Sequence, residues 1–317
     1  MRRRRRLPRV VALGGGHGLY SSLQALRRVT SEVTAIVTVA DDGGSSGRLR
    51  REFDILPPGD LRMALAALCG DDRDGRLWAD ILQSRFGGDG PLAGHAIGNL
   101  LLAGVWEQLG DPVEGLDMVA RLLDVQGRVL PMSTVPLQIE ADVIGLDATA
   151  PDETRLLRGQ ATVAKTPGEV RAVRLVPAAP PACPQALAAL TDADWVVLGP
   201  GSWFTSVLPH LLVPDLAAAI IGAKRRCLTM NLDPAAETEG YTASEHLEVL
   251  AEHAPALRLD AVVVDPTFLR GDPHFERFAG SLGARVHVAE IRLNDGSARH
   301  DPNRLASVYA DVMGLVG

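Results

Sequence analysis

The most constraining feature of this sequence is a glycine-rich segment between an apolar run and a helical pattern. Residues 10–13 form the apolar run, and Gly14-Gly15-Gly16-His17-Gly18 follow it directly. A helical pattern covers residues 19–28, and the β-branched run at residues 33–39 is typical of a second buried strand. A strand, a glycine loop, a helix and a strand make a βαβ unit, which requires a parallel sheet with a right-handed crossover.

The rest of the chain continues this α/β texture. Residues 41–59 are polar and rich in Gly, Ser and Pro, which predicts a loop, and Asp60 is expected to cap a helix at residues 61–68. Asp111 is expected to cap a helix at 112–124. We expect one α/β domain over residues 1–317, with a continuous main sheet. Further helices are predicted at 76–86, 96–109, 205–212, 216–223, 244–253 and 273–282, and further strands at 195–198, 226–231, 259–264 and 285–289.

Residues 128–176 have a different pattern. Short alternating segments at 138–143, 160–164 and 170–175 are typical of antiparallel strands. We therefore expect a small β-rich insertion at 128–176 within the domain.

Composition limits the classes of protein that need considering. With 46% hydrophobic and 22% charged residues, the chain is an ordinary globular protein. A net charge of −7 is unfavourable for general binding to nucleic acid backbones, so no nucleic acid partner is expected. Three scattered cysteines favour reduced thiols and a cytoplasmic location. Residues 1–8 form a basic tail without the long apolar region of a signal peptide, and no segment is long and apolar enough to span a membrane.

The glycine segment itself is a candidate anion site. Gly14, Gly15, Gly16 and Gly18 allow a sharp turn and the close approach of a phosphate, and the following helix supplies free N–H groups. An NAD site is an open alternative, because Asp41 and Asp42 follow the second strand, where an acid would meet a ribose hydroxyl. The third glycine falls one residue too early for the dinucleotide fingerprint, and no Gly-Lys-Ser/Thr follows, which excludes a Walker A loop.

A second candidate site is the run Asp41-Asp42-Gly43-Gly44-Ser45-Ser46-Gly47-Arg48. The two carboxylates could hold Mg²⁺ together with substrate phosphates, or they could bind ribose or base donors. The Ser and Gly N–H groups could form an anion nest, and the guanidinium of Arg48 suits a phosphate. The run follows a buried strand, where ligands bind in open α/β sheets.

Three further segments carry candidate ligand-binding residues. Arg62 lies in the first turn of its predicted helix, where its charge opposes the helix dipole, so a ligand or carboxylate partner is expected for it. A histidine near a helix start, followed one turn later by an asparagine, could bind phosphate or act as a general acid. A second strand-to-helix loop offers another anion site on the same edge of the sheet. The candidates are Asp60 and Arg62, His95 and Asn99, and Gly199, Gly201 and Ser202.

No complete catalytic machinery is visible in the sequence. It contains no G-x-S-x-G elbow, no H-E-x-x-H motif and no CxxC pair. The polar stretch from Asn231 to Thr242 follows a predicted strand, and its acids could bind a metal or sugar hydroxyls. The residues supply binding loops without an evident nucleophile and base, so we lean against an enzyme.

Taken together, these motifs resemble the gluconeogenesis factors of the YvcK-like family, which are related to the CofD 2-phospho-L-lactate transferases. The resemblance covers nearly the whole chain, and the run from Asp41 to Arg48 is its most specific part. The segments that carry it are 13–19, 36–50, 58–62, 94–101, 129–131, 199–202 and 237–242.

The resemblance implies a Rossmann-like three-layer sandwich. It also implies binding of a nucleotide sugar such as UDP-N-acetylglucosamine, and a regulatory role that links growth on gluconeogenic carbon sources to cell shape and wall synthesis. By similarity, Phe278 and Arg299 would contact the nucleotide. His17 stands where the family usually has Thr, Phe278 stands where Tyr occurs, and the segment 231–236 is one residue short.

Three functions therefore stay open. The first is a nucleotide-sugar-binding regulator, the second is an Mg²⁺-dependent phosphotransferase like CofD, and the third is an NAD-linked oxidoreductase. Base rates for soluble folds also lead us to expect a homodimer.

Overall fold

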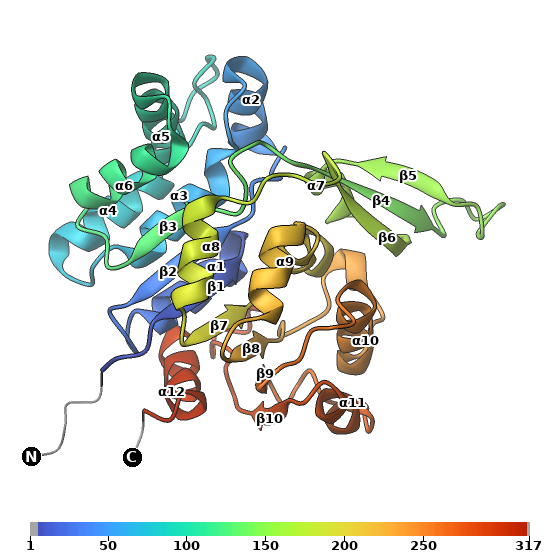
Figure 1. Cartoon of the computed structure of the whole chain (residues 1–317). Helices are drawn as coiled ribbons and strands as arrows, with labels where there is room; N and C mark the ends of the chain where they lie inside the picture. The colour runs from blue at the N-terminus through green and yellow to red at the C-terminus, as the bar shows by residue number, and fades with distance from the viewer. Residues whose placement is uncertain (1–5, 316–317) are drawn as a thin grey trace, which may run out of the picture.

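The computed structural model describes residues 6–315, so the first five residues of the basic tail lie outside the described part. Its core is a seven-stranded, wholly parallel sheet in the order β10-β9-β8-β7-β1-β2-β3 (Figure 1). The strands are β1 (Val10–Gly14), β2 (Val33–Val37), β3 (Arg128–Pro131), β7 (Trp195–Leu198), β8 (Arg226–Thr229), β9 (Ala261–Val264) and β10 (Arg285–Val288).

The central strand β1 organises the sheet. Its five residues are all buried, as are those of its neighbour β7, because helices cover both faces of a parallel sheet. Val10 pairs with Val33 of β2 on one side and with Trp195 of β7 on the other. The strand order therefore reverses direction between β1 and β7, which makes their carboxyl ends the topological switch point.

Two helical layers cover the sheet. One includes α1 (Gly16–Leu26), which packs against α3 (Pro58–Leu68) and the last helix, α12 (Pro302–Val312). The other includes α8 (Pro184–Asp192), α9 (Pro214–Ile221) and α10 (Ala243–His253), with α8 against α9 (Figure 1). The expected α/β three-layer sandwich with a mainly parallel sheet is confirmed.

The segment between β2 and β3 is more helical than predicted. Residues 41–59 contain α2 (Gly44–Phe53) rather than a loop alone, and α3 begins at Pro58, which puts Asp60 inside its first turn instead of at its cap. The Asp111 cap is confirmed, because its carboxylate accepts from the N–H groups of Val113 and Glu114. The other helices here are α4 (Arg73–Gln83), α5 (Ile97–Leu109) and α6 (Pro112–Leu122).

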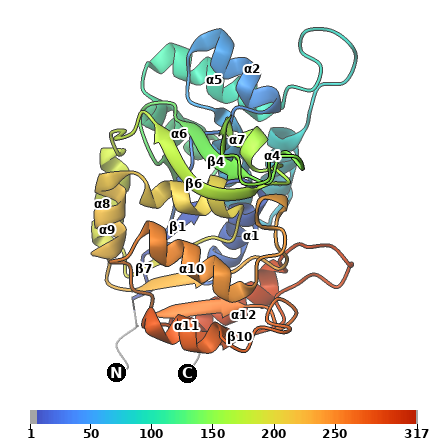
Figure 2. The same ribbon diagram turned by 90° about the vertical axis from the view of Figure 1, so that its right-hand side faces the viewer.

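The β-rich segment is divided between two sheets. β3 joins the main sheet as its edge strand, and only the residues after it form a separate antiparallel sheet in the order β5-β4-β6. Figures 1 and 2 show this small sheet projecting above the main one. The prediction of a strand at 160–164 is wrong, because those residues form the short helix α7. The elements are β4 (Gln138–Ile144), β5 (Arg155–Arg158), α7 (Gln160–Val163) and β6 (Glu169–Val176).

The carboxyl-terminal half is completed by α11 (Phe275–Ser281) and three short turns of helix, η1 (Trp203–Val207), η2 (Leu208–Leu211) and η3 (Ala236–Thr238). No single helix in the described range 6–315 is long and apolar enough to cross a membrane. The bent pair formed by residues 203–211 and 214–221 meets that test by length and composition, with a bend of 80°. Most of this pair is buried in the protein core, including Trp203 and Phe204.

Candidate functional site

Two glycine loops meet at the switch point. Gly14 ends β1 in extended backbone, and Gly16, His17 and Gly18 already form the first turn of α1, three residues earlier than predicted. A Cβ atom on Gly18 would lie 2.3 Å from the carbonyl oxygen of Pro200 in the loop after β7. Only glycine permits so close an approach. The two candidate anion loops are therefore in contact, as expected from their position at the same edge of the sheet.

A pocket of about 440 Å³ opens beside this contact. Its walls come from the start of α1, the loops after β7 and β8, and the segment that leads into α12. Five of the predicted site residues line it: His17, Gly18, Gly201, Ser202 and Arg299. The other lining residues include Tyr20, Ser21, Gln24, Asn231, Asp233, Leu293 and His300.

The loop after β7 is braced from behind by residues that the sequence analysis placed only in a polar stretch. The side chain of Asn231 accepts from the N–H of Gly201 and donates to its carbonyl, both at 2.9 Å. Glu237 is buried, and its Oε1 accepts from the hydroxyl of Ser202 and from the N–H of Phe204 at 3.2 Å. These two side chains therefore hold the loop in place. The available signal for this role was an asparagine at the carboxyl end of a buried strand, and β8 ends two residues before it, at Thr229.

Carboxylates gather on the other side of the β1 loop. Asp60 accepts a hydrogen bond from the N–H of Gly16 and lies 3.4 Å from the hydroxyl of Thr38. Burial, and then the charge of Asp41, raise the pKa of Asp60 to about 7. Asp41 accepts from the N–H of Gly43 at 2.9 Å, and burial raises its pKa as well. Asp60 thus faces the first turn of α1, which carries no acidic side chain of its own.

Asp42 has a different role from its neighbour. Its Oδ1 accepts from the N–H of Ala161 at 3.0 Å, and a Cβ atom on Gly159 would lie 2.1 Å from its other carboxylate oxygen. Its carboxylate is therefore committed to α7. The fold thus places Asp41 between two acidic neighbours: in addition to burial, its charge raises the pKa of Asp60, and the charge of Asp42 raises its own.

Ser45, His95 and Asn99 form a buried hydrogen-bonded chain. The Asn99 amide donates to Ser45 Oγ at 3.0 Å, and Ser45 Oγ lies 2.9 Å from His95 Nδ1. The serine oxygen accepts from Asn99, and its hydrogen bond with Nδ1 runs in the direction that the imidazole tautomer sets. Burial, followed by the charges of Arg48 and Arg85, lowers the pKa of His95, so the ring is neutral near pH 7.

The remaining residues of the second candidate run surround this chain. Gly43 is the N-cap residue of α2 and Gly44 is its first residue, with a positive φ of 47°. Ser46 contributes a hydrogen bond to Asp41. Arg48 donates to the carbonyl of Ala93 at 2.8 Å.

Arg62 and Phe278 lie away from the pocket. Arg62 is buried, donates to Leu82 and Gln83, and has a pKa lowered to about 10 by burial and by Arg85. Phe278 lies half-buried on α11, where it packs against the core, so the structure does not bring it to the residues that line the pocket. Arg299 does reach the rim, where it pairs with Asp295 at 2.7 Å.

The residues around the glycine loops supply only part of a metal-ligand set. Within residues 6–315 no group of three or more His, Cys, Asp or Glu side chains is arranged to hold a metal ion. Asp41 and Asp60 supply two carboxylates, and Mg²⁺ commonly binds through one or two carboxylates plus waters and ligand phosphates. The donor set fits a metal that arrives with a phosphorylated ligand.

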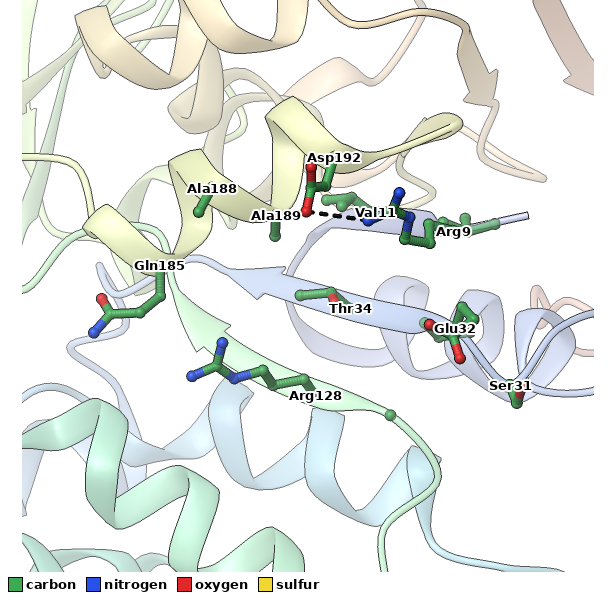
Figure 3. Close-up of a pocket in the computed structure, with 13 residues that line it drawn as sticks. Arg9, Val11, Ser31, Glu32, Thr34, Arg128, Gln185, Ala188, Ala189 and Asp192 are labelled. Atoms are coloured by element: carbon green, nitrogen blue, oxygen red, sulfur yellow. Dashed lines mark ion pairs between the residues drawn. The ribbon is translucent and has the colours of Figure 1, made fainter. Parts of the chain in front are cut away.

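Figure 3 shows another cavity of about 440 Å³, between α8 and the amino ends of β1, β2 and β3. Arg9 and Asp192 form an ion pair at its rim, at 3.1 Å. This cavity lies at the opposite end of the strands from the glycine loops, and ligands of open α/β sheets bind at the carboxyl ends. The switch-point pocket is therefore the stronger candidate.

The doubly wound parallel sheet and the cleft at its switch point define a Rossmann-like α/β protein. The chain belongs to the CofD family, because the family model described as "2-phospho-L-lactate transferase CofD" matches residues 10–276.

Relatives with a more specific name are similar over most of their length. A protein of Mycobacterium tuberculosis named "Putative gluconeogenesis factor" is 58% identical over 96% of this chain and 90% of its own. The "Gluconeogenesis factor" of Halalkalibacterium halodurans is 38% identical over 83% of this chain and 78% of its own. A crystal structure of a UPF0052 family member from Bacillus halodurans superposes with a TM-score of 0.83 at 34% identity, covering 96% of this chain and 98% of that one.

Proposed function

We propose that this protein binds a nucleotide sugar such as UDP-N-acetylglucosamine in the switch-point pocket and acts as a regulator rather than an enzyme. The observation that carries this proposal is the meeting of two glycine loops in one wall of a 440 Å³ pocket. Pockets of this size accommodate small ligands, and loops of this kind bind phosphates. The regulatory role, in growth on gluconeogenic carbon and in cell shape and wall synthesis, is proposed from the relatives' printed name and from the family resemblance.

The pocket suggests how the two halves of such a ligand would lie. The nucleoside half would occupy the side lined by Tyr20, Leu232 and Arg299, where apolar and cationic groups are combined. The diphosphate would then lie over Gly18 and Gly201, near the positive end of α1. The sugar would extend towards Asp41, where carboxylates can accept hydrogen bonds from hydroxyl groups.

Mg²⁺ is proposed as an accessory of this site. Asp60 faces the first turn of α1 with a pKa near 7, so above that pH its charge opposes an incoming phosphate. A divalent cation held by Asp41 and Asp60 would supply the positive charge that screens this repulsion. The structure therefore supports tighter ligand binding with Mg²⁺ at pH 8 than without it.

An Mg²⁺-dependent phosphotransferase is the second candidate, favoured by one specific observation. The hydroxyl of Ser45 is hydrogen-bonded to the neutral imidazole of His95, and Ser45 belongs to the same run as Asp41. A transfer reaction needs such positioned polar groups, a metal and phosphate loops. The match to the CofD family is consistent with this alternative.

Calorimetric titration with UDP-N-acetylglucosamine, UDP-glucose, GDP and NAD, each with and without Mg²⁺, tests the proposal. UDP-sugar binding without product formation supports the regulator, and binding of GDP alone, only with Mg²⁺, supports the transferase. Binding of NAD alone would revive the oxidoreductase.

Two matched variants locate the ligand. Arg299→Gln is expected to weaken UDP-sugar binding by about tenfold, because a charge-assisted hydrogen bond is lost. Arg277→Gln, on exposed α11, is the control and should bind as the wild type does. Phe278→Leu should also bind normally, since that ring lies outside the pocket lining. If Phe278→Leu weakens binding and Arg299→Gln does not, the nucleoside binds at α11 and not in this pocket.

A further inference from the structure

Three arginines lie around the segment that leads into α5 without forming an ion pair within residues 6–315. Arg48, Arg62 and Arg85 come from α2, from α3 and from the loop after α4. No carboxylate oxygen in the described part of the chain lies within 4.0 Å of their guanidinium nitrogens. Elsewhere in the protein arginines pair readily, as Arg128 does with Asp117 at 2.7 Å.

The two outer arginines converge on one turn of the backbone. Arg48 donates to the carbonyl of Ala93 and Arg85 to that of Gly94, both at 2.8 Å. A Cβ atom on Gly94 would lie 3.6 Å from Arg48 Nη2, so this guanidinium rests directly on the peptide before His95. Backbone carbonyls orient the two groups without an ion pair, although Arg85 is exposed to solvent and the charge of Glu52 on α2 also acts at His95.

The inner arginine adds to this excess of charge. Arg62 is only 4% exposed, its Nε has no hydrogen-bond partner, and it donates to Leu82 and Gln83 rather than to a carboxylate. Burial, and then the charge of Arg85, lower the pKa of Arg62. Burial and the charges of Arg48 and Arg85 lower the pKa of His95, and the charge of Glu52 acts in the opposite direction. Asp41 and Asp60 partly offset Arg62, but they accept hydrogen bonds from Gly43 and Gly16. A buried cation without an ion pair is costly unless a ligand compensates it.

Uncharged polar groups complete the surroundings of the three arginines. α2 is ten residues long, begins at Gly44 with no side-chain cap, and has no acidic residue in its first turn. Its free N–H groups therefore lie beside Ser45. Asn99 is 1% exposed, and its Oδ1 has no partner among the described residues. The unpartnered donors in this part of the described chain are therefore the Nε–H of Arg62 and the first N–H groups of α2, and both suit an anionic acceptor. The Oδ1 of Asn99 is itself an acceptor, so it would take a donor such as the hydroxyl of a monoprotonated phosphate.

We infer that Arg48, Arg62 and Arg85, with His95 and the start of α2, form a second subsite that binds a small oxyanion, a phosphate or a carboxylate. This subsite shares no residue with the lining of the switch-point pocket. The inference deepens the proposed function and rests on it for the identity of the first ligand. The second ligand is either a separate anionic metabolite or an acidic group at the far end of the first.

The test is calorimetry with inorganic phosphate, and in a parallel arm with malonate, on the full chain with and without UDP-N-acetylglucosamine. Arg85→Gln and Arg48→Gln are expected to weaken anion binding about tenfold each, because each removes one charged donor. Arg121→Gln, an exposed arginine on α6, is the matched control and should bind as the wild type does. Circular dichroism and thermal melting show whether each variant is folded. The arm that binds more tightly identifies the class of oxyanion.

The two proposals fail in different ways. Phosphate or malonate binding that is weakened by Arg85→Gln and Arg48→Gln, but not by Arg121→Gln, supports the subsite even if no UDP-sugar binds. Equal anion binding in all four proteins, or no binding by the wild type, overturns the subsite even if the UDP-sugar binds in its own pocket.

Discussion

At the scale of single residues, the site depends on two properties that composition alone does not convey. One is the absence of a side chain where the loops after β1 and β7 touch at Gly18. The other is the burial of carboxylates, which gives Asp60 a pKa far from that of a surface aspartate. Each property leads to a measurable expectation.

Gly18→Ala is expected to destabilise the fold by on the order of 2–3 kcal/mol, because the new methyl group would overlap the carbonyl of Pro200. The free energy of unfolding in urea measures this. Gly104→Ala is the control, since a Cβ atom at that exposed position on α5 has nothing within 4 Å. There alanine should be neutral or stabilise by up to about 1 kcal/mol. Equal effects of the two substitutions would contradict a close contact at Gly18.

The raised pKa of Asp60 predicts that the stability of the fold depends on pH. Its pKa is higher in the folded chain, at about 7, than its ordinary value of 3.8. The folded state therefore retains a proton that the unfolded state loses, and the associated stability, full below pH 4, is lost as the pH rises to 7 and above.

Asp60→Asn removes this titration. When the pH is raised from 5 to 8, the wild type is expected to lose roughly 2 kcal/mol more of its free energy of unfolding than the variant does. Denaturation in urea at the two pH values measures the difference, with Asp89→Asn in an exposed loop as the control. A wild type and an Asp60→Asn variant with the same pH slope would show that Asp60 is not the titrating group.

At the scale of elements, the strands were easier to predict than the helices. Short apolar, β-branched runs identified β1, β2 and β7, because buried parallel strands have few alternatives. α2 was missed because Gly44-Ser45-Ser46-Gly47 has low helix propensity. Tertiary contacts hold it instead, including Arg50 donating to the carbonyl of Leu137 at 2.6 Å.

α7 was also missed, because a contact that is distant in the sequence holds it. Its four residues have strand-like composition and are too short to form a helix alone. The carboxylate of Asp42, more than a hundred residues earlier, accepts from its first turn. No local pattern contains that contact, so the sequence could show Asp42 as a candidate ligand but not as the anchor of α7.

Asp42→Ala should therefore loosen α7. Hydrogen exchange over residues 159–165 is expected to become about tenfold faster, since the hydrogen bond to Ala161 is lost. Asp42→Asn keeps a carbonyl acceptor and is the matched control, with exchange near that of the wild type. If hydrogen exchange is unchanged in Asp42→Ala, the carboxylate does not hold α7 and remains a candidate ligand-binding group.

At the scale of the whole molecule, one buried hydroxyl connects the end of the chain to its beginning and to its middle. Tyr309 on α12 lies 2.9 Å from the hydroxyl of Ser22 on α1 and 2.8 Å from that of Thr229 on β8. One continuous main sheet could be expected from the α/β texture. The return of α12 to α1 could not, because no local pattern specifies a partner so far away.

Tyr309→Phe should cost about 1–2 kcal/mol in the free energy of unfolding, since two buried hydroxyls lose their partner. Tyr241→Phe, at a side chain for which no hydroxyl hydrogen bond is found in the described structure, is the control and should change stability little. A similar loss in both variants would attribute the effect to ring packing rather than to the hydrogen bonds.

The central place of β1 also has a consequence for how the protein is made. Its partner β7 lies across the switch point, and the contact between Arg9 and Asp194 already spans 185 positions. During synthesis, β1, β2 and β3 emerge from the ribosome first, while the second glycine loop and Arg299 are still untranslated. A nascent chain stopped before β7 would have half a sheet with an exposed apolar edge at β1, which makes it a substrate for chaperones. The proposed ligand-binding pocket, which includes Arg299 and Pro302, would be complete only when translation is nearly finished.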